Sequence, residues 1–375
     1  MGSTTARRLG VGVLVAGVAL SAAACGSSKK STSGGGNTGG GGASTGATNT
    51  EAASSPQDAF TQAIGNITSG DSATVTLKIG ATADQIKSFA AATGTAAKDV
   101  PSDATLALIT GASLTFTTHA ESGDLKTAAT TGKTDTDVAV NVGGGSVLDI
   151  RYIGGSKQLF VKVDVPKIAD LAHKTVPPQV AQLGASPQYA FIKDALAGKW
   201  LELQGFAALA QQFAGLKGGA SASAAPGVSE DFAAKLLSSL SADVTATDAG
   251  STDKGEHLVL AAPLQKLAGD VETLISSVPG GSLAGSKLPK LSDVPDKTVM
   301  IDAYVKDHAL TSLSLDIVQF APADKAAKVA GQHLPVELDF SSSAGDTGAP
   351  SGATAVDLSK LAAQFGPLLG SQLGG

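Results

Sequence analysis

Cys25 is the residue whose type and position are best suited to chemistry, because it is the one cysteine in the 375-residue chain. A thiolate is a strong nucleophile, so a cysteine at a defined site is readily modified. Upstream of it lie the basic pair Arg7 and Arg8, the apolar segment Leu9–Leu20 and the small residues Ser21–Ala24. This order of positive charge, apolar segment and small residues predicts an export signal.

The small residues and the cysteine resemble the lipobox of bacterial lipoproteins, in which the thiol receives a diacylglycerol and the chain is cut just before it. We therefore expect residues 1–24 to be a signal peptide and Cys25 to be lipidated. The apolar run from Leu9 to Ala24 has 16 residues, fewer than the roughly 20 that a membrane-spanning helix needs. The alternative is an ordinary secretory signal whose cleavage region contains a cysteine. An exported protein would then carry a reactive unpaired thiol, which favours lipidation.

Other residues that commonly catalyse reactions are scattered. Ser229 lacks the second glycine of a G-x-S-x-G elbow, and the glycines of Gly143–Gly145 do not match a phosphate-binding loop. Arg151 lies on the polar side of an alternating strand, where it either clamps an acidic headgroup or is solvated. The histidines form no H-x-x-x-H or H-E-x-x-H pattern; they are His119, His173, His257, His308 and His333. We predict no enzyme activity, no cofactor and no metal site.

Composition also excludes a nucleic-acid partner. The chain has a formal net charge of −6, and loss of the two signal-peptide arginines makes the mature part more acidic. Arg151 is the one arginine that remains, and the lysines are scattered singly. Aromatic residues are 4% of the sequence, with one tryptophan. There is therefore neither a basic stripe for phosphates nor a set of rings on which bases stack.

The body of the protein begins after a tether. Residues 25–55 are nearly all Gly, Ser, Thr, Ala and Asn, and such a chain has a root-mean-square span of about 30 Å. Ser55 and Pro56 then fit the start of an amphipathic helix that extends to Ile67. Residues 56–342 are predicted to form one domain with a possible internal linker at 215–229, and residues 343–375 a further linker and an amphipathic C-terminal segment.

Most of this domain alternates apolar and polar residues with the period of two that indicates half-buried strands. Glycine-rich turns separate several of the strands, as expected of an antiparallel meander. The predicted strands cover residues 74–79, 114–117, 138–142, 148–152, 159–165, 199–203, 243–247, 257–261, 298–305, 310–317 and 335–340. Helical spacing is concentrated in the middle of the chain, at residues 166–173, 189–196, 206–213 and 231–240. We predict an α+β fold: a strongly curved antiparallel β-sheet, or half-barrel, packed over a cluster of helices.

A curved sheet with one apolar face can enclose a cavity for acyl chains, each buried methylene contributing about 0.8 kcal/mol. The alternative is a filled core without a cavity. The residues predicted to line such a cavity are Val75, Leu77, Ile79, Leu114, Phe116, Val138, Val140, Leu148, Ile150, Val299, Ile301, Leu313 and Leu315.

The same order of features resembles a known family. A lipobox, a Gly/Ser tether, the helix with Asp58-Ala-Phe60, the meander with Asp149-Ile-Arg-Tyr152 and the pair Lys199-Trp200 are similar to those of the LppX/LprG-type lipoproteins of actinobacteria, which share their fold with LolA and LolB. This resemblance implies a half-barrel that holds the acyl chains of a lipid or glycolipid and carries it through the cell envelope. Cys25 is the one position of this sequence to which the resemblance assigns a functional role.

We therefore expect a lipoprotein on the outer face of the cell membrane, anchored through acylated Cys25, with a lipid or glycolipid ligand and a membrane transporter as partner. The alternative is a structural or partner-binding envelope lipoprotein with a solid core. A hydrolase would require that folding bring histidine and carboxylate side chains together in a pocket.

Overall fold

The computed structural model describes residues 55–206, 244–269 and 296–361, apart from His173, Pro322, Ala344 and Asp346. The predicted signal peptide, Cys25, nearly all of the tether, the linker at 215–229 and the helix at 231–240 lie outside the described residues, as does most of the C-terminal segment.

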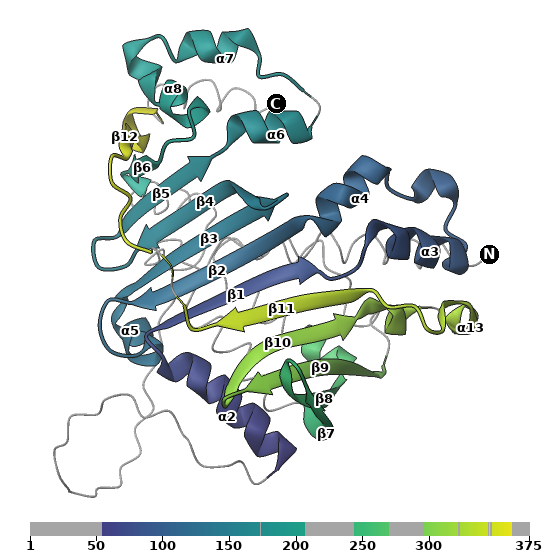
Figure 1. The fold of residues 1–375 in the computed structure, drawn as a ribbon. Helices are drawn as coiled ribbons and strands as arrows, with labels where there is room; N and C mark the ends of the chain where they lie inside the picture. The colour runs from purple at the N-terminus through teal and green to yellow at the C-terminus, as the bar shows by residue number, and fades with distance from the viewer. Residues whose placement is uncertain are drawn as a thin grey trace, which may run out of the picture.

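A single twelve-stranded sheet forms the centre of the protein, in the order β12-β6-β5-β4-β3-β2-β1-β11-β10-β9-β8-β7. Its strands are β1 (Ser72–Ile79), β2 (Ala112–Ala120), β3 (Thr134–Val142), β4 (Gly145–Ile153), β5 (Gln158–Val163), β6 (Leu201–Gln204), β7 (Thr245–Thr252), β8 (Gly255–Pro263), β9 (Thr298–Lys306), β10 (Ala309–Asp316), β11 (Pro335–Ser341) and β12 (Thr354–Asp357). Neighbouring strands are antiparallel except for β12, which runs parallel to β6. The sheet is curved and unclosed, with β12 and β7 at its edges (Figure 1). The predicted α+β half-barrel is confirmed.

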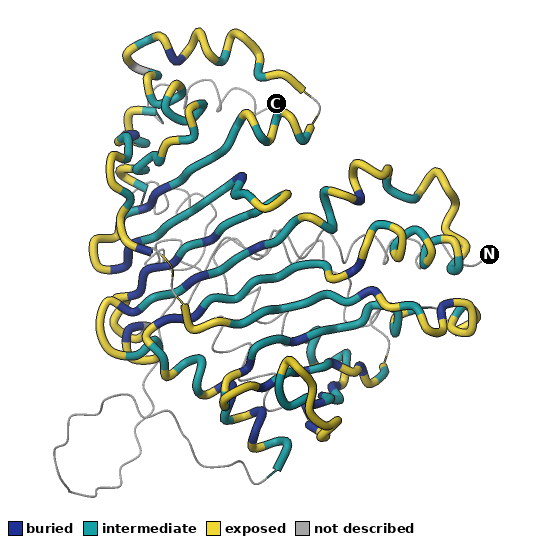
Figure 2. The backbone as a smooth tube through the Cα atoms, in the orientation of Figure 1, coloured by how far each residue is buried: buried dark blue, intermediate teal, exposed yellow. Residues whose placement is uncertain are grey.

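The described helices lie mainly beyond the ends of the strands (Figure 1). They are α2 (Pro56–Ser69), α3 (Ala83–Thr93), α4 (Asp103–Thr110), α5 (Leu125–Thr131), α6 (Val165–Leu171), α7 (Pro178–Leu183), α8 (Ala190–Leu196) and α13 (Ala326–Val329), with 3₁₀ turns η1 (Ala97–Asp99), η2 (Pro187–Tyr189) and η4 (Ile317–Phe320). Figure 2 shows exposed residues concentrated in the outer helices and turns, whereas most strands are half-buried or buried; the edge strand β7 is mostly exposed. Within the described part of the chain, no helix is both long enough and apolar enough to cross a bilayer.

Helix α2 forms as the sequence predicts. The Ser55 hydroxyl accepts a hydrogen bond from the Asp58 amide at 3.2 Å, and Pro56 occupies the first turn, where its missing N–H costs no hydrogen bond. Phe60 is fully buried and Ile64 nearly so. This apolar stripe attaches the helix to one face of the sheet.

Short turns fix the register of the strands. Gly143 and Gly144 have φ of +57° and +76° in the predicted β3–β4 turn, the backbone form that matches the twist of a two-residue hairpin. Asp307 and His308 adopt the same form between β9 and β10, with φ of +51° and +61°. The side chain of Asn66 on α2 donates to the His308 carbonyl at 2.8 Å and holds this turn against the helix.

The sheet extends past the boundary predicted at residue 342. The described residues of 342–353, which we call the strap, connect the end of β11 in the centre of the sheet to β12 at its edge (Figure 1). Strand β12 then pairs with β6 from Thr354 opposite Leu201 to Asp357 opposite Gln204.

Candidate functional site

One face of the sheet is apolar across most of its width. Side chains of directly opposed residues in neighbouring strands point to the same face. Val75 on β1 lies opposite Phe116 on β2 and Phe340 on β11. Followed from strand to strand, the register joins three rows of apolar side chains, which together we call the apolar face. The rows are Leu201, Val161, Ile150, Val138, Phe116, Val75 and Phe340; Val163, Leu148, Val140, Leu114, Leu77, Leu338, Leu313, Ala303 and Leu258; and Ile79, Val336, Leu315, Ile301 and Leu260.

Every residue that the sequence predicts as cavity lining lies on this face. Twelve of the thirteen are in the three rows, and Val299 lies two residues before Ile301 on β9. The spacing of two along each strand was therefore enough to bring these residues together. That they line a cavity stays a prediction.

Burial divides the apolar face into two halves. Over strands β7 to β10, α2 packs on the sheet and forms a core in which Phe60, Leu258 and Leu260 have no exposed surface. Val299, Ile301 and Leu313 belong to this core. In the β1–β5 half, Leu114 and Val138 are buried, but most of the row residues keep part of their surface exposed; these are Val75, Leu77, Ile79, Phe116, Val140, Leu148 and Ile150.

The opposite face, which we call the polar face, is built from hydroxyls and charges. Thr74 and Thr117 share a hydrogen bond of 3.0 Å across β1 and β2. Lys78 forms ion pairs with Asp339 and, at 3.3 Å, with Glu337. The hydrogen bond to Asp339 raises the pKa of the Lys78 amine above its ordinary value. These pairs satisfy charges along the strands and leave the two faces chemically distinct.

Arg151 lies on the polar face, as predicted, but its guanidinium is neither free for a headgroup nor solvated. Its Nε donates to Asp137 at 2.5 Å, with the two side chains 14% and 15% exposed. Its Nη1 donates to the Gly348 carbonyl in the strap at 3.0 Å. The guanidinium also lies 4.8 Å from the ring centre of Trp200. Arg151 is thus a structural residue that joins β4 to the strap and to the start of β6.

Further contacts hold both ends of the strap. The Ser72 hydroxyl donates to the Ser342 carbonyl at 2.5 Å. At the other end the Thr354 amide donates to the Trp200 carbonyl and its hydroxyl to Asp194, both at 2.9 Å. Hydrogen bonds from Lys199 and then Thr354 lower the pKa of the Asp194 carboxyl. The strap could not be predicted from the sequence, because its stabilising contacts are with residues far away in the chain.

A buried acid lies where β3 meets the β4–β5 turn. Asp135 is 8% exposed and accepts a hydrogen bond from the Gly154 amide at 3.1 Å. Burial raises the pKa of this carboxyl, and nearby Glu121 adds to the effect. His119 lies opposite Asp135 on β2, and its Nδ1 is buried with no hydrogen-bond partner among the described residues.

Folding brings histidines to carboxylates at two other places. His257 Nε2 lies 2.8 Å from Asp302, and the ring stacks on Tyr304 with centres 4.8 Å apart. Burial, followed by the charge of Asp302, raises the pKa of the Tyr304 hydroxyl. His333 Nδ1 lies 2.8 Å from Asp316. Neither His257 nor His333 lines the pocket described next, and in the described ranges no three His, Cys, Asp or Glu side chains are placed to hold a metal ion.

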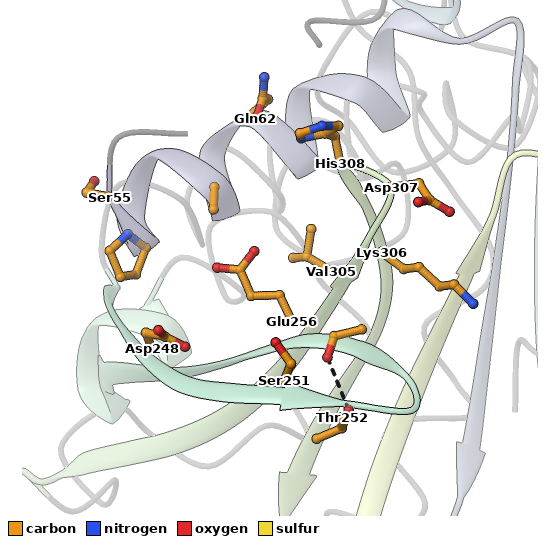
Figure 3. Close-up of a pocket in the computed structure, with 13 residues that line it drawn as sticks. Ser55, Gln62, Asp248, Ser251, Thr252, Glu256, Val305, Lys306, Asp307 and His308 are labelled. Carbon is orange, nitrogen blue, oxygen red and sulfur yellow. Dashed lines mark hydrogen bonds between the residues drawn. The ribbon is translucent and has the colours of Figure 1, made fainter. Parts of the chain in front are cut away.

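A surface pocket of about 660 Å³ lies between the start of α2 and the turns of the β7–β8 and β9–β10 hairpins. Its walls carry polar groups, and Glu256 projects into its middle beside Val305 (Figure 3). The pocket lies next to Ser55, where the predicted tether joins the body. It is separate from the β1–β5 half of the apolar face, and the sequence did not predict it.

No family model matches the sequence, and no curated protein matches it. Among solved structures, the chain is similar to the crystal structure of LprF from Mycobacterium bovis, with a TM-score of 0.32 and 9% identity over 80% of this chain and 97% of that one. A likeness at this level carries no argument about function. The resemblance to LppX/LprG-type lipoproteins stays a prediction, and the function has to be argued from the faces of the sheet.

Proposed function

We propose that this protein is a membrane-anchored lipoprotein that binds the acyl chains of a lipid or glycolipid on the β1–β5 half of the apolar face. It carries or presents this ligand in the cell envelope and catalyses no reaction. The observation that supports the proposal is the contrast between the two halves: one is filled by α2, whereas the other has the same apolar rows with part of their surface exposed.

The dimensions and chemistry of this half fit an acyl chain. Five strands about 4.8 Å apart give a width of about 19 Å, and the rows across it contain branched aliphatic side chains and Phe116. Each methylene buried there contributes about 0.8 kcal/mol. An acyl chain needs no polar partner, which agrees with the position of the charged side chains of β1 to β5, all of which lie on the polar face.

The anchor in this proposal is Cys25. A single acyl chain binds a membrane only marginally, whereas the several chains of a bacterial lipoprotein hold it firmly. The Cys25→Ala variant is expected to yield soluble or uncleaved protein. Normal processing with unchanged membrane partition would refute lipidation.

Native mass spectrometry of protein purified from its own membranes tests the binding function. We expect co-purifying lipid on the wild type and less of it on Val140→Gln, which places an amide on the apolar face. Ala139→Gln, on the polar face of the same strand, is the matched control and should keep its lipid. A folded wild type that is consistently free of lipid would refute the proposal.

The packed core under α2 favours a second candidate, a structural or partner-binding envelope lipoprotein whose apolar face is filled throughout. It predicts one stoichiometric protein partner and no lipid in the same purification.

A further inference from the structure

The strands of this sheet have two chemically different ends. Because neighbours are antiparallel, β1, β3, β5 and β10 all finish at the same end. The connections there contain most of the helices: α3 and α4 between β1 and β2, α6 to α8 between β5 and β6, and η4 and α13 between β10 and β11. We call this the helical end (Figure 1).

All large apolar side chains that are strongly exposed in the described residues lie at the helical end. Their exposed fractions range from 37% to 50%, and they are Ile168 on α6, Leu183 on α7, Met300 near the start of β9 and Phe320 in η4. Isolated exposed apolar residues are normal on protein surfaces. Their confinement to one end of the sheet is the observation that requires an explanation.

The helices at this end present little buried surface of their own. None of the residues of α6, α7 or α3 is buried. Figure 2 shows α7 largely exposed, and the residues of α6 alternate between half-buried and exposed. A helix whose apolar side chains stay in water gains little stability from the rest of the fold. An apolar partner would supply the missing burial.

One basic side chain at this end lies against an exposed apolar residue. The Lys297 amine lies 4.7 Å from the ring centre of Phe320 and donates to the Gln319 carbonyl. The charged amine itself thus lies over an exposed ring, in a cation–π contact, and also reaches a polar group. A positive charge therefore lies beside the exposed Phe320 at this end.

The opposite end of the sheet is polar. The connections at this end include the turn at residues 154–157, the turn at 253–254, the Asp307–His308 turn and the start of the strap, together with the short helix α5 between β2 and β3. Gly155 and Asp307 are exposed there. Among the described residues, no large apolar side chain at this end is strongly exposed.

We propose that the helical end docks on the surface of a lipid bilayer, with Ile168, Leu183, Met300 and Phe320 entering its interfacial region. The apolar face runs to this end through Ile79 and Val336, so docking would place a bilayer next to the proposed acyl-chain site. This inference rests on the anchored lipoprotein proposed above.

The length of the tether allows this orientation. A strand of eight residues such as β1 is about 27 Å long. The residues between Cys25 and Ser55 have an average span of about 30 Å and a fully extended reach of about 100 Å. A body held at the membrane by Cys25 can therefore turn its helical end toward the bilayer.

Site-specific fluorescence on the full, acylated chain tests the docking. Leu183→Cys and Phe320→Cys each introduce the one free thiol, since acylated Cys25 has none. Lys157→Cys in a polar turn and Asp248→Cys at an exposed position of the edge strand β7 are the controls. Each variant is labelled with an environment-sensitive dye and reconstituted into phosphatidylcholine–phosphatidylglycerol vesicles that contain doxyl-labelled lipid. We expect at least threefold stronger quenching at positions 183 and 320 than at 157 and 248.

Equal quenching at all four positions, or none at any of them, would overturn the proposal. Circular dichroism identifies a variant that fails to fold, and Met300→Cys then replaces it. The double variant Leu183→Asp/Ile168→Asp, labelled at Phe320→Cys, should lose at least half of the quenching at 320.

Native mass spectrometry of the same preparations separates this proposal from the binding function. Lipid-loaded protein without quenching at the helical end would refute docking and leave lipid binding intact. Lipid-free protein with strong quenching at the helical end would refute lipid binding and leave docking intact. Two dyes on a single-cysteine variant would show that Cys25 is not acylated.

Discussion

The guanidinium of Arg151 lies 4.8 Å from the ring centre of Trp200. This contact joins β4 to the residue that precedes β6, and the same guanidinium holds the strap through Gly348. One side chain thereby stabilises three segments that are distant in the sequence. It is the one arginine after Arg8 in the sequence. The planar, multiply donating guanidinium suits a site that needs stacking and two directions of hydrogen bonding.

Arg151→Ala is expected to lower the free energy of unfolding by about 2 to 4 kcal/mol, because it removes the ion pair with the largely buried Asp137. Lys162→Ala is the control: its amine lies 5.8 Å from the same ring centre but its side chain is 37% exposed, so the cost should be below about 1 kcal/mol. Urea unfolding measures both. Equal costs would show that Arg151 is not the main support of the strap.

The Asp135 carboxyl should make stability depend on pH in an unusual direction. Its folded-state pKa is raised by burial, so its contribution is fully present below the unfolded pKa of about 4 and is lost as pH rises through the folded value. Asp135→Asn keeps an oxygen that accepts from Gly154 and cannot ionise. The variant should match the wild type near pH 4 and become relatively more stable toward pH 7, as measured by urea midpoints.

Asp124 provides the control of opposite sign. Hydrogen bonds from the Thr127 side chain and amide lower the pKa of its carboxyl, so the stability that it contributes appears above the unfolded pKa and is lost as pH falls. Asp124→Asn should therefore become relatively less stable toward pH 7. If Asp135→Asn and Asp124→Asn showed the same pH trend, the opposite directions of the two pKa shifts would be contradicted.

The β7–β8 hairpin offers a matched pair of glycines. Gly255 has φ of +116°, and a Cβ there would overlap the Val305 carbonyl oxygen, whereas Gly250 has φ of +99° with no atom within 4 Å of such a Cβ. Gly250→Ala should cost about 1 to 2 kcal/mol from backbone strain. Gly255→Ala should cost at least about 1 kcal/mol more, because backbone must move. Thermal unfolding compares them, and equal melting temperatures would be inconsistent with the close approach of the strands.

Helix α2 should be stabilised mainly by Phe60. Its ring has no exposed surface, and Phe60→Ala is expected to cost about 3 to 5 kcal/mol through lost burial and the cavity left behind. Ile67→Ala, at a partly buried position on the same helix, should cost less than half as much. Chemical unfolding of the two variants tests whether α2 is anchored at its first half.

The strands and α2 could be predicted because their pattern is local. Alternation along single segments such as Val75, Leu77 and Ile79 identified the apolar face correctly, since opposed residues of an antiparallel sheet share a face. The helix α3 was missed although Thr82 and Gln85 form a capping box that the sequence displays. Its apolar residues stay half-exposed, so they give only a weak helical pattern.

Other parts of the site could not be predicted from local patterns. Strand β12 has only four residues, and its partner β6 lies more than 100 residues earlier in the chain. Arg151 contacts Trp200 and Gly348, and no regular sequence spacing relates these three residues. The division of the apolar face into a filled and a partly exposed half depends on where α2 packs. Alternation along a strand identifies which side chains share a face, but it carries no information on what covers them.

The position of β1 in the sheet has a consequence for how the chain folds. Ile79 on β1 lies opposite Val336 on β11. One edge of β1 pairs with β2, and the other can be paired only after β11, more than 250 residues later, has formed. Contacts of such long sequence separation slow folding, and an unpaired strand edge is prone to aggregation. The sheet is therefore completed only once β11 has been synthesised, and until then the second edge of β1 is open to pairing with another chain.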